Sequence, residues 1–289
     1  MKISLLIQAA INGLLLGGVY SLVAVGLSLI FGVMRVINFA HGEMMVWGMY
    51  IAYWWFVLTG WNPYFSLLVS PPLVFLMGYT VQRLLVNRIL DVPEEMQVLL
   101  LLGVALVLQN SALLFWGPDF RTIQTPYSLS TIWLGEFVID VPRIVAFGLA
   151  ILLTLLLSLF LTTTELGRSI RASADNREGA MLVGINVEKI YAVSFGVGAA
   201  CVGAAGALIV PFLPVSPHVS LPFTLTAFVV VILGGMGSLF GAFIGGLIVG
   251  VGESLGAVLL SSSFKQIVSF TLLILIMLFR PQGLFGGRG

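Results

Sequence analysis

The fold turns on residues 231–250, VILGGMGSLFGAFIGGLIVG, which lie inside a long apolar segment at about residues 223–257. A membrane-spanning helix needs roughly 20 apolar residues, so this segment is too long for one ordinary span. The glycines of residues 233–238 would interrupt a helix, because glycine is a poor helix former. As a helix, residues 223–234 would rise only about 18 Å, short of the ~30 Å hydrocarbon core. We therefore expect a short entering helix, a glycine break and a longer second helix.

The composition of the whole chain places it in a membrane. Of its 289 residues, 59% are hydrophobic and 9% are charged, with a mean hydropathy of +1.11. A soluble domain would be about 45–50% apolar and about 25% charged. The net charge of +1 gives no indication of a nucleic-acid partner. The apolar composition instead implies the lipid bilayer as a partner.

Eight long apolar segments are expected, at about residues 5–31, 43–60, 64–86, 96–116, 142–163, 190–212, 223–257 and 264–280. Polar loops separate them, among them a short charged loop at 87–95, a longer loop at about 117–142 that contains Pro126, and a cationic loop at about 164–189. We predict an all-α fold, a polytopic transmembrane helical bundle with at least one broken or half-helix. A single transmembrane domain would span residues 1–289.

Cationic side chains orient the bundle. The loop at 164–189 carries Arg168, Arg171, Arg177 and Lys189, and the C-terminal tail carries Arg280 and Arg288. The positive-inside rule places that loop and the tail in the cytoplasm, and the loop at 117–142 outside. Both placements hold only if residues 223–257 cross twice or contain a half-helix. The same parity puts the N-terminus outside.

The cationic loop predicts two short helices. Gly167 and Arg168 would open the first, and Asp175 would cap the second, with Glu178 completing a capping box. Gly184 suits the end of the second helix, and Asn186 would cap the next span. Residues such as Ala180 and Leu182 give the second helix an apolar surface. That surface would either lie on the membrane or its own protein, or dock on another protein.

Three more features concern the interior. The stretch MRVINFAHGEMMVW, residues 34–47, places Arg35, Asn38, His41 and Glu43 between apolar runs, as either a wet loop or a structured element. Asn38 would cap the following helix, with Glu43 in its first turn, where an acid suits the helix dipole. This break is similar in form to residues 233–238, which suggests a distant internal repeat.

Glu253 is either an intramembrane functional acid or a residue at the headgroups. Glycines at spacing four, such as Gly241 and Gly245, suit tight packing within one bundle or a dimer face.

Several chemistries are excluded. A phosphate-binding loop ends in Gly-Lys-Ser/Thr, and none of Lys2, Lys189 and Lys265 precedes Ser or Thr. Two histidines and one cysteine are too few for a zinc site of four His and Cys ligands, and we expect no metal. No nucleophile and base are paired, so we expect no enzyme and no cofactor in this chain.

Four motifs together carry a family resemblance. They are NFAHGE (38–43), GRSIRASADNREGAMLVGIN (167–186), LGGMGSLFGAFIGGLIVG (233–250) and RPQGLFG (280–286). In this order they resemble the permease subunits of Liv-type branched-chain amino acid ABC importers, specifically the shorter of their two permeases.

The resemblance implies an inner-membrane ABC-importer permease that works by alternating access. It implies a second related permease, two cytoplasmic ATPase subunits that bind ATP and Mg²⁺, and a periplasmic or surface substrate-binding protein. The ATPase-coupling residues would be Gly167, Arg168, Arg171, Asp175, Arg177, Glu178, Ala180, Leu182 and Gly184. Candidates for the translocation path are Asn38, His41, Glu43, Gly234, Gly235, Gly237, Ser238 and Glu253.

The substrate stays open, because similar permeases carry urea, amides, other neutral amino acids or aromatic acids. Two other functions also stay open. An ion-coupled secondary transporter would use Glu43, Glu253 and the possible repeat. A small-solute channel would use a re-entrant element at residues 38–43. Neither requires the capped cationic loop.

Overall fold

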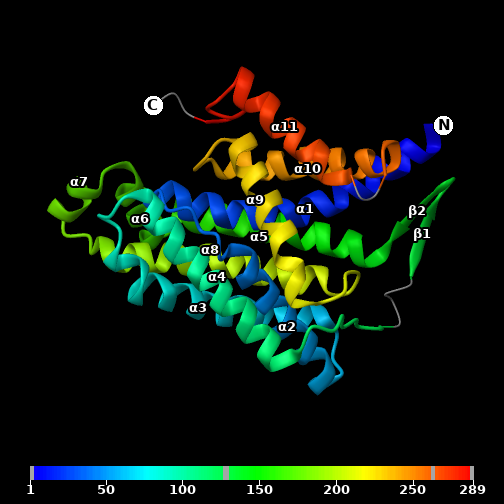
Figure 1. The fold of residues 1–289 in the computed structure, drawn as a ribbon, viewed down its shortest axis with the longest axis horizontal. Helices are drawn as coiled ribbons and strands as arrows, with labels where there is room; N and C mark the ends of the chain where they lie inside the picture. Colours follow the sequence, from blue (N-terminus) through cyan, green and yellow to red (C-terminus); the bar gives the residue numbers. More distant parts are fainter. Residues whose placement is uncertain (1–2, 126–129, 262–263, 287–289) are drawn as a thin grey trace.

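The computed structural model describes residues 3–125, 130–261 and 264–286, and it is a helical bundle (Figure 1). The elements are α1 (Ile3–Met34), α2 (His41–Thr59), η1 (Pro63–Leu68), α3 (Ser70–Leu84), η2 (Val86–Arg88), α4 (Glu94–Trp116), β1 (Thr131–Leu134), β2 (Phe137–Asp140), α5 (Val141–Thr163), α6 (Glu165–Asp175), α7 (Arg177–Leu182), α8 (Val187–Ile209), η3 (Pro217–Val219), α9 (Ser220–Gly234), α10 (Leu239–Leu259) and α11 (Lys265–Phe279). Among the described residues, seven helical segments are long and apolar enough to cross a membrane. The predicted polytopic helical fold is confirmed.

The long apolar segment at 223–257 forms two helices, each of which belongs to a segment long and apolar enough to cross a membrane. It is divided into α9 and α10 at the predicted glycines, where Gly235 and Gly237 adopt φ angles of 103° and 86°. The two helices pack antiparallel, with Gly241 against Gly234 and Gly245 against the carbonyl oxygen of Val230. The 15 residues of α9 rise about 22 Å, so the predicted short helix and longer partner form a hairpin closed by a glycine turn.

The ends of the bundle follow from this hairpin. α1 packs antiparallel to α10, because Gly13 lies against Gly250 and Gly32 lies against Gly237. The glycine turn shares a cavity with Arg171 of α6 and Gln282 of the tail. The N-terminus therefore lies at the end opposite to α6, α7 and the tail, as Figure 1 shows, in agreement with the predicted parity.

The predicted loop at 117–142 contains a two-stranded antiparallel hairpin, β1–β2, that the sequence analysis did not predict. The stretch TIWLGEFVID is too short for an alternation of apolar and polar residues to predict strands. Gln8 of α1 holds the hairpin, because its side chain bonds both the N–H and the carbonyl oxygen of Val138. Pro126 and Arg288, which entered the predictions for this loop and for the tail, lie outside the described residues.

Small residues bring the central helices into backbone contact. A Cβ at Gly246 of α10 would lie 2.5 Å from the backbone nitrogen of Ser21 in α1. A Cβ at Gly250 would lie 2.5 Å from Gly17 Cα. The hydroxyl of Ser21 also donates to the carbonyl oxygen of Phe243, at 2.6 Å. The glycines at spacing four therefore pack within one bundle, which was the first of their two interpretations.

This packing predicts a difference between two glycine-to-alanine variants. Gly246→Ala should lower the unfolding free energy by about 1–3 kcal/mol, because an overpacked core must shift its backbone. The control is Gly103→Ala in α4, which has open space where the Cβ would lie. The measurement is unfolding of the detergent-solubilised protein. Equal stability of the two variants would contradict the close α1–α10 contact.

Candidate functional site

The segment between α1 and α2 folds back into the bundle. Arg35 ends α1 with a φ of 56°, and it is the one non-glycine residue with positive φ in the described chain. Val36, Asn38 and His41 are then completely buried. His41 Nε2 lies 3.0 Å from the carbonyl oxygen of Val23, in the middle of α1. The segment is therefore a structured element, and the wet-loop interpretation is wrong.

The prediction that Asn38 caps α2 is also wrong. The N-cap position is Ala40, whose side chain accepts no hydrogen bond. The Asn38 side-chain oxygen accepts instead from the Ala40 N–H, at 3.0 Å, which forms a turn one residue before the helix. Glu43 does lie in the first turn of α2, as predicted.

The same motif holds polar atoms with no partner. Within the described chain, Asn38 Nδ2, His41 Nδ1 and Glu43 Oε2 are buried and make no hydrogen bond. Gly42, between them, packs against Thr224 and the carbonyl oxygen of Ser220 at the start of α9. Buried polar atoms in folded proteins are nearly always paired. Three of the buried polar atoms that lack a partner in the described chain therefore belong to this one motif.

Glu253 is buried between four helices, so the headgroup interpretation is wrong. Its carboxylate accepts hydrogen bonds from the hydroxyls of Tyr20 (α1, 3.0 Å), Ser269 (α11, 2.7 Å) and Thr226 (α9, 3.3 Å). The sequence analysis missed these three partners, because they lie 16 to 233 residues away and hydroxyls carry no motif. With both oxygens occupied, Glu253 acts as a hub that joins α1, α9, α10 and α11.

The cationic loop forms α6 and α7, but with other caps than predicted. α6 begins at Glu165, two residues before Gly167, and is capped by Thr164, whose hydroxyl accepts from the Gly167 N–H at 3.0 Å. Asp175 is the last residue of α6 and caps nothing. Asn176 caps α7, because its side-chain oxygen accepts from the Gly179 N–H at 2.8 Å. Glu178 is then one position too early for the predicted capping box.

The predicted end of α7 is confirmed. Gly184 has a φ of 86°, and the N–H groups of Gly184 and Ile185 donate to the carbonyls of Met181 and Ala180, both at 3.0 Å. These two bonds are those of a Schellman motif. Asn186 caps α8 by accepting from the Lys189 N–H, as predicted.

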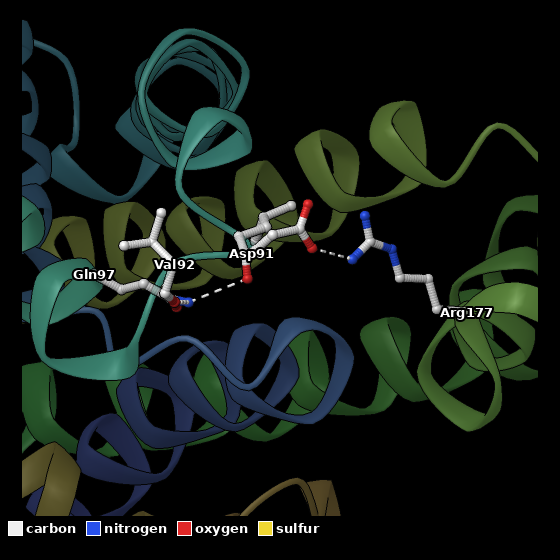
Figure 2. Close-up of polar contacts among 5 residues, drawn as sticks. Asp91, Val92, Gln97 and Arg177 are labelled. Carbon is white, nitrogen blue, oxygen red and sulfur yellow. Dashed lines mark hydrogen bonds and ion pairs between the residues drawn. The ribbon is translucent and has the colours of Figure 1, made fainter.

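A second loop holds α7 in place. Arg177 donates to Asp91 in the α3–α4 loop, at 2.9 Å (Figure 2). Gln97 of α4 holds that loop, because its side chain donates to the carbonyl oxygen of Val92 at 2.9 Å. The hydrogen bond with Asp91 raises the pKa of Arg177 above its ordinary value. The charged α3–α4 loop and the cationic loop therefore lie on the same side of the bundle.

The apolar residues of α7 point outward. Ala180 is buried, but Leu182 and Val183 are 88% and 77% exposed. Arg168 and Arg171 of α6 are also exposed. A short helix closed at both ends therefore presents an apolar tip beside cationic side chains.

A cavity of about 1070 Å³ brings two sets of predicted residues together. It is lined by Arg171 and Asp175 of α6 and by Gly237 and Ser238 of the glycine turn. Gly234 and Gly235 directly precede Met236 in the chain and do not line the cavity. The cavity does not include residues 38–43 or Glu253, so the predicted path residues fall into three separate places. Within the described chain, no three His, Cys, Asp or Glu residues are placed to hold a metal ion.

The tail motif RPQGLFG completes one wall of this cavity. The N–H groups of Leu284 and Phe285 donate to the carbonyl oxygens of Leu233 and Gly234, at 2.9 and 3.0 Å. Gly283 lies so close to Gly235 that a Cβ there would overlap its backbone. The two glycines of this motif, Gly283 and Gly286, are the sequence signal for such a close backbone approach.

The Glu253 hub predicts a loss of stability on substitution. Glu253→Ala should leave three hydroxyl donors without an acceptor, at a cost of about 1–3 kcal/mol for each buried group. Glu253→Gln keeps one carbonyl oxygen and should lose less. Thermal unfolding in detergent measures both. If Glu253→Ala unfolds at the wild-type temperature yet abolishes transport, the residue acts in the path and not as a hub.

The comparisons with known proteins agree with these features. The family described as branched-chain amino acid transport system / permease component matches residues 9–277. The permease protein BraD of Pseudomonas aeruginosa and the permease protein LivH of Escherichia coli strain K12 are both named as parts of high-affinity branched-chain amino acid transport systems. Each is 32% identical to this chain, over 97% of this chain and 95% of the relative.

A second type of permease protein also matches. LivM of Salmonella typhimurium is 27% identical, over 92% of this chain and 67% of its own length. No solved structure matches the chain. The shorter, LivH-like type is therefore the better match, as the sequence motifs indicated. The chain belongs to the family of branched-chain amino acid transport system permease components, and it is a multi-pass inner-membrane permease of an ABC importer, not an enzyme.

Proposed function

We propose that this permease imports branched-chain amino acids. Its LivH and BraD relatives are named for that substrate class and align with nearly its whole length. We propose that residues 1–289 form one permease domain, which pairs with a second, LivM-like permease. Two cytoplasmic ATPase subunits would drive the pair, and a periplasmic or surface binding protein would deliver the amino acid.

The observation that carries the coupling role is the exposed tip of α7. Leu182, the last residue of α7, and Val183, which follows it, are 88% and 77% exposed, and a helix of six residues is not stable alone in water. Its caps and the Arg177–Asp91 contact hold it in position. Burial of the tip against an ATPase subunit would remove apolar surface from water, which favours binding.

The coupling motion would pass from α7 to α6 and then to the glycine turn. α6 and the turn line the same cavity, and α6 follows α5 after a single residue, Thr164. Alternating access would close or open this cavity as ATP is bound and hydrolysed. Asn38, His41 and Glu43, whose unpaired polar atoms lie deeper in the bundle, are the candidates to line the path above it.

Transport by the purified complex tests this function. The permease pair, the ATPase subunits and the binding protein would be reconstituted in proteoliposomes with radiolabelled leucine. We expect saturable uptake that needs both ATP and the binding protein. Uptake driven by an ion gradient without the ATPase subunits would show that the protein is a secondary transporter and not an ABC importer. Uptake by a passive, non-saturable route would indicate a channel.

A pair of glycine variants tests the coupling role of α7. Gly184→Val should reduce ATP-dependent uptake and ATPase binding, because a β-branched residue at positive φ costs about 1–3 kcal/mol and would open the end of α7.

The matched control is Gly135→Val in the β1–β2 turn. Gly135 also has positive φ, 64°, and open space around it, but it lies at the other end of the bundle. We expect that this variant couples normally. Normal coupling in Gly184→Val, or an equal defect in both variants, would contradict the docking role.

A further inference from the structure

Four charged side chains, all of them exposed, surround the open cavity between α6 and the glycine turn. Two cations, Arg35 and Arg171, and two anions, Glu94 and Asp175, line it. None of the four forms an ion pair in the described chain, where the ion pairs are Arg143–Asp140 and Arg177–Asp91. Two opposite pairs of charges are therefore available to a ligand in the same space.

Two further features suit the binding of a small molecule. The volume of about 1070 Å³ is at the upper end of the roughly 300–1,000 Å³ of small-molecule pockets. Ser28 of α1 also lines the cavity, and its hydroxyl is buried without a hydrogen-bond partner. Arg35, which directly follows α1, has a left-handed backbone with a φ of 56°.

A second, apolar cavity adjoins the first and is partly open at the surface of the bundle, where its lining residues Leu155 and Phe240 are exposed. This cavity, of about 220 Å³, shares Ser158, Leu239 and Phe240 with the first. It extends between α1, α5 and α10 as far as Val25 and Phe243. The charged space therefore adjoins an apolar space between α1, α5 and α10.

We propose that the two joined cavities are a binding site for a free aliphatic amino acid on its way into the cytoplasm. The carboxylate would lie near Arg35 and Arg171, and the ammonium group near Glu94 and Asp175. The aliphatic side chain would occupy the apolar pocket at Leu239. The ligand class rests on the proposed function, whereas the position and charge of the site come from this chain alone.

This proposal gives α6 and α7 different tasks. The two ionisable residues of α6 that line the cavity, Arg171 and Asp175, contact the passing amino acid. α7, with its exposed apolar tip, contacts the ATPase. The loop that receives the ATPase motion is then also one wall of the release site.

Protection from chemical modification tests the site directly. Cys201 is the only cysteine of the chain, so Cys201→Ala provides a cysteine-free background. Thr162→Cys places a thiol on the cavity wall, and Thr163→Cys places one on the adjacent exposed residue that does not line it. In the assembled complex in nanodiscs, leucine should slow modification of the Thr162→Cys protein by a membrane-impermeant thiol reagent. At about nine times its dissociation constant the factor is about tenfold. The Thr163→Cys protein should react at an unchanged rate.

A second pair of variants tests the apolar pocket by transport. Leu239→Trp would fill the pocket at the start of α10, and Leu259→Trp places the same side chain on the exposed opposite end of that helix. We expect the first to lower the maximal uptake rate several-fold while the ATPase subunits still copurify, and the second to transport normally.

The outcomes separate this site from the proposed function. If the wild-type complex transports another solute and not leucine, the proposed substrate is wrong, and that solute becomes the protection probe. If the transported solute protects neither thiol, or if only ATPase binding protects the Thr162→Cys protein, the cavity is not a solute site. Equal transport by the two tryptophan variants would also overturn the proposal.

Discussion

The last carbonyl groups of a helix have no partners within that helix, and at the end of α9 the C-terminal tail supplies partners for two of them. The carbonyls of Leu233 and Gly234 accept hydrogen bonds from the backbone of the C-terminal tail. The tail reaches them only because Gly235 and Gly283 have no side chains. This backbone contact joins the tail to the α9–α10 turn, and the two together form one wall of the cavity.

The same contact connects the two regions that a driven permease must connect. The tail and the glycine turn form one side of the cavity, and α6 forms another. α6 leads directly to α7, whose exposed tip is the surface proposed for the ATPase. A movement of a few ångströms at α7 can therefore reach the cavity through short, rigid elements. Coupling through packed elements of this kind needs no continuous chain of charges.

The sequence predicted the bundle, the glycine break and the orientation well, because hydropathy and cationic loops report directly on the membrane. Gly184 and Asn186 were also placed correctly, since caps follow local rules. The cap of α7 was misplaced by one residue because Asp175 and Asn176 are both good caps. The hydroxyl partners of Glu253 could not be predicted, because nothing local brings Tyr20 and Ser269 to it. The re-entrant path of residues 35–40 likewise depends on contacts with α1 and α9.

The most direct test of this account is the side of the membrane on which the α9–α10 turn lies. Single cysteines at the exposed positions Met236 in the turn and Trp133 in β1 would be introduced into the Cys201→Ala protein. An impermeant thiol reagent would then be added to one face of sealed membranes. The account predicts that the Met236→Cys protein is labelled only from the cytoplasm, and the Trp133→Cys protein only from outside. Labelling of both from the same side would contradict it.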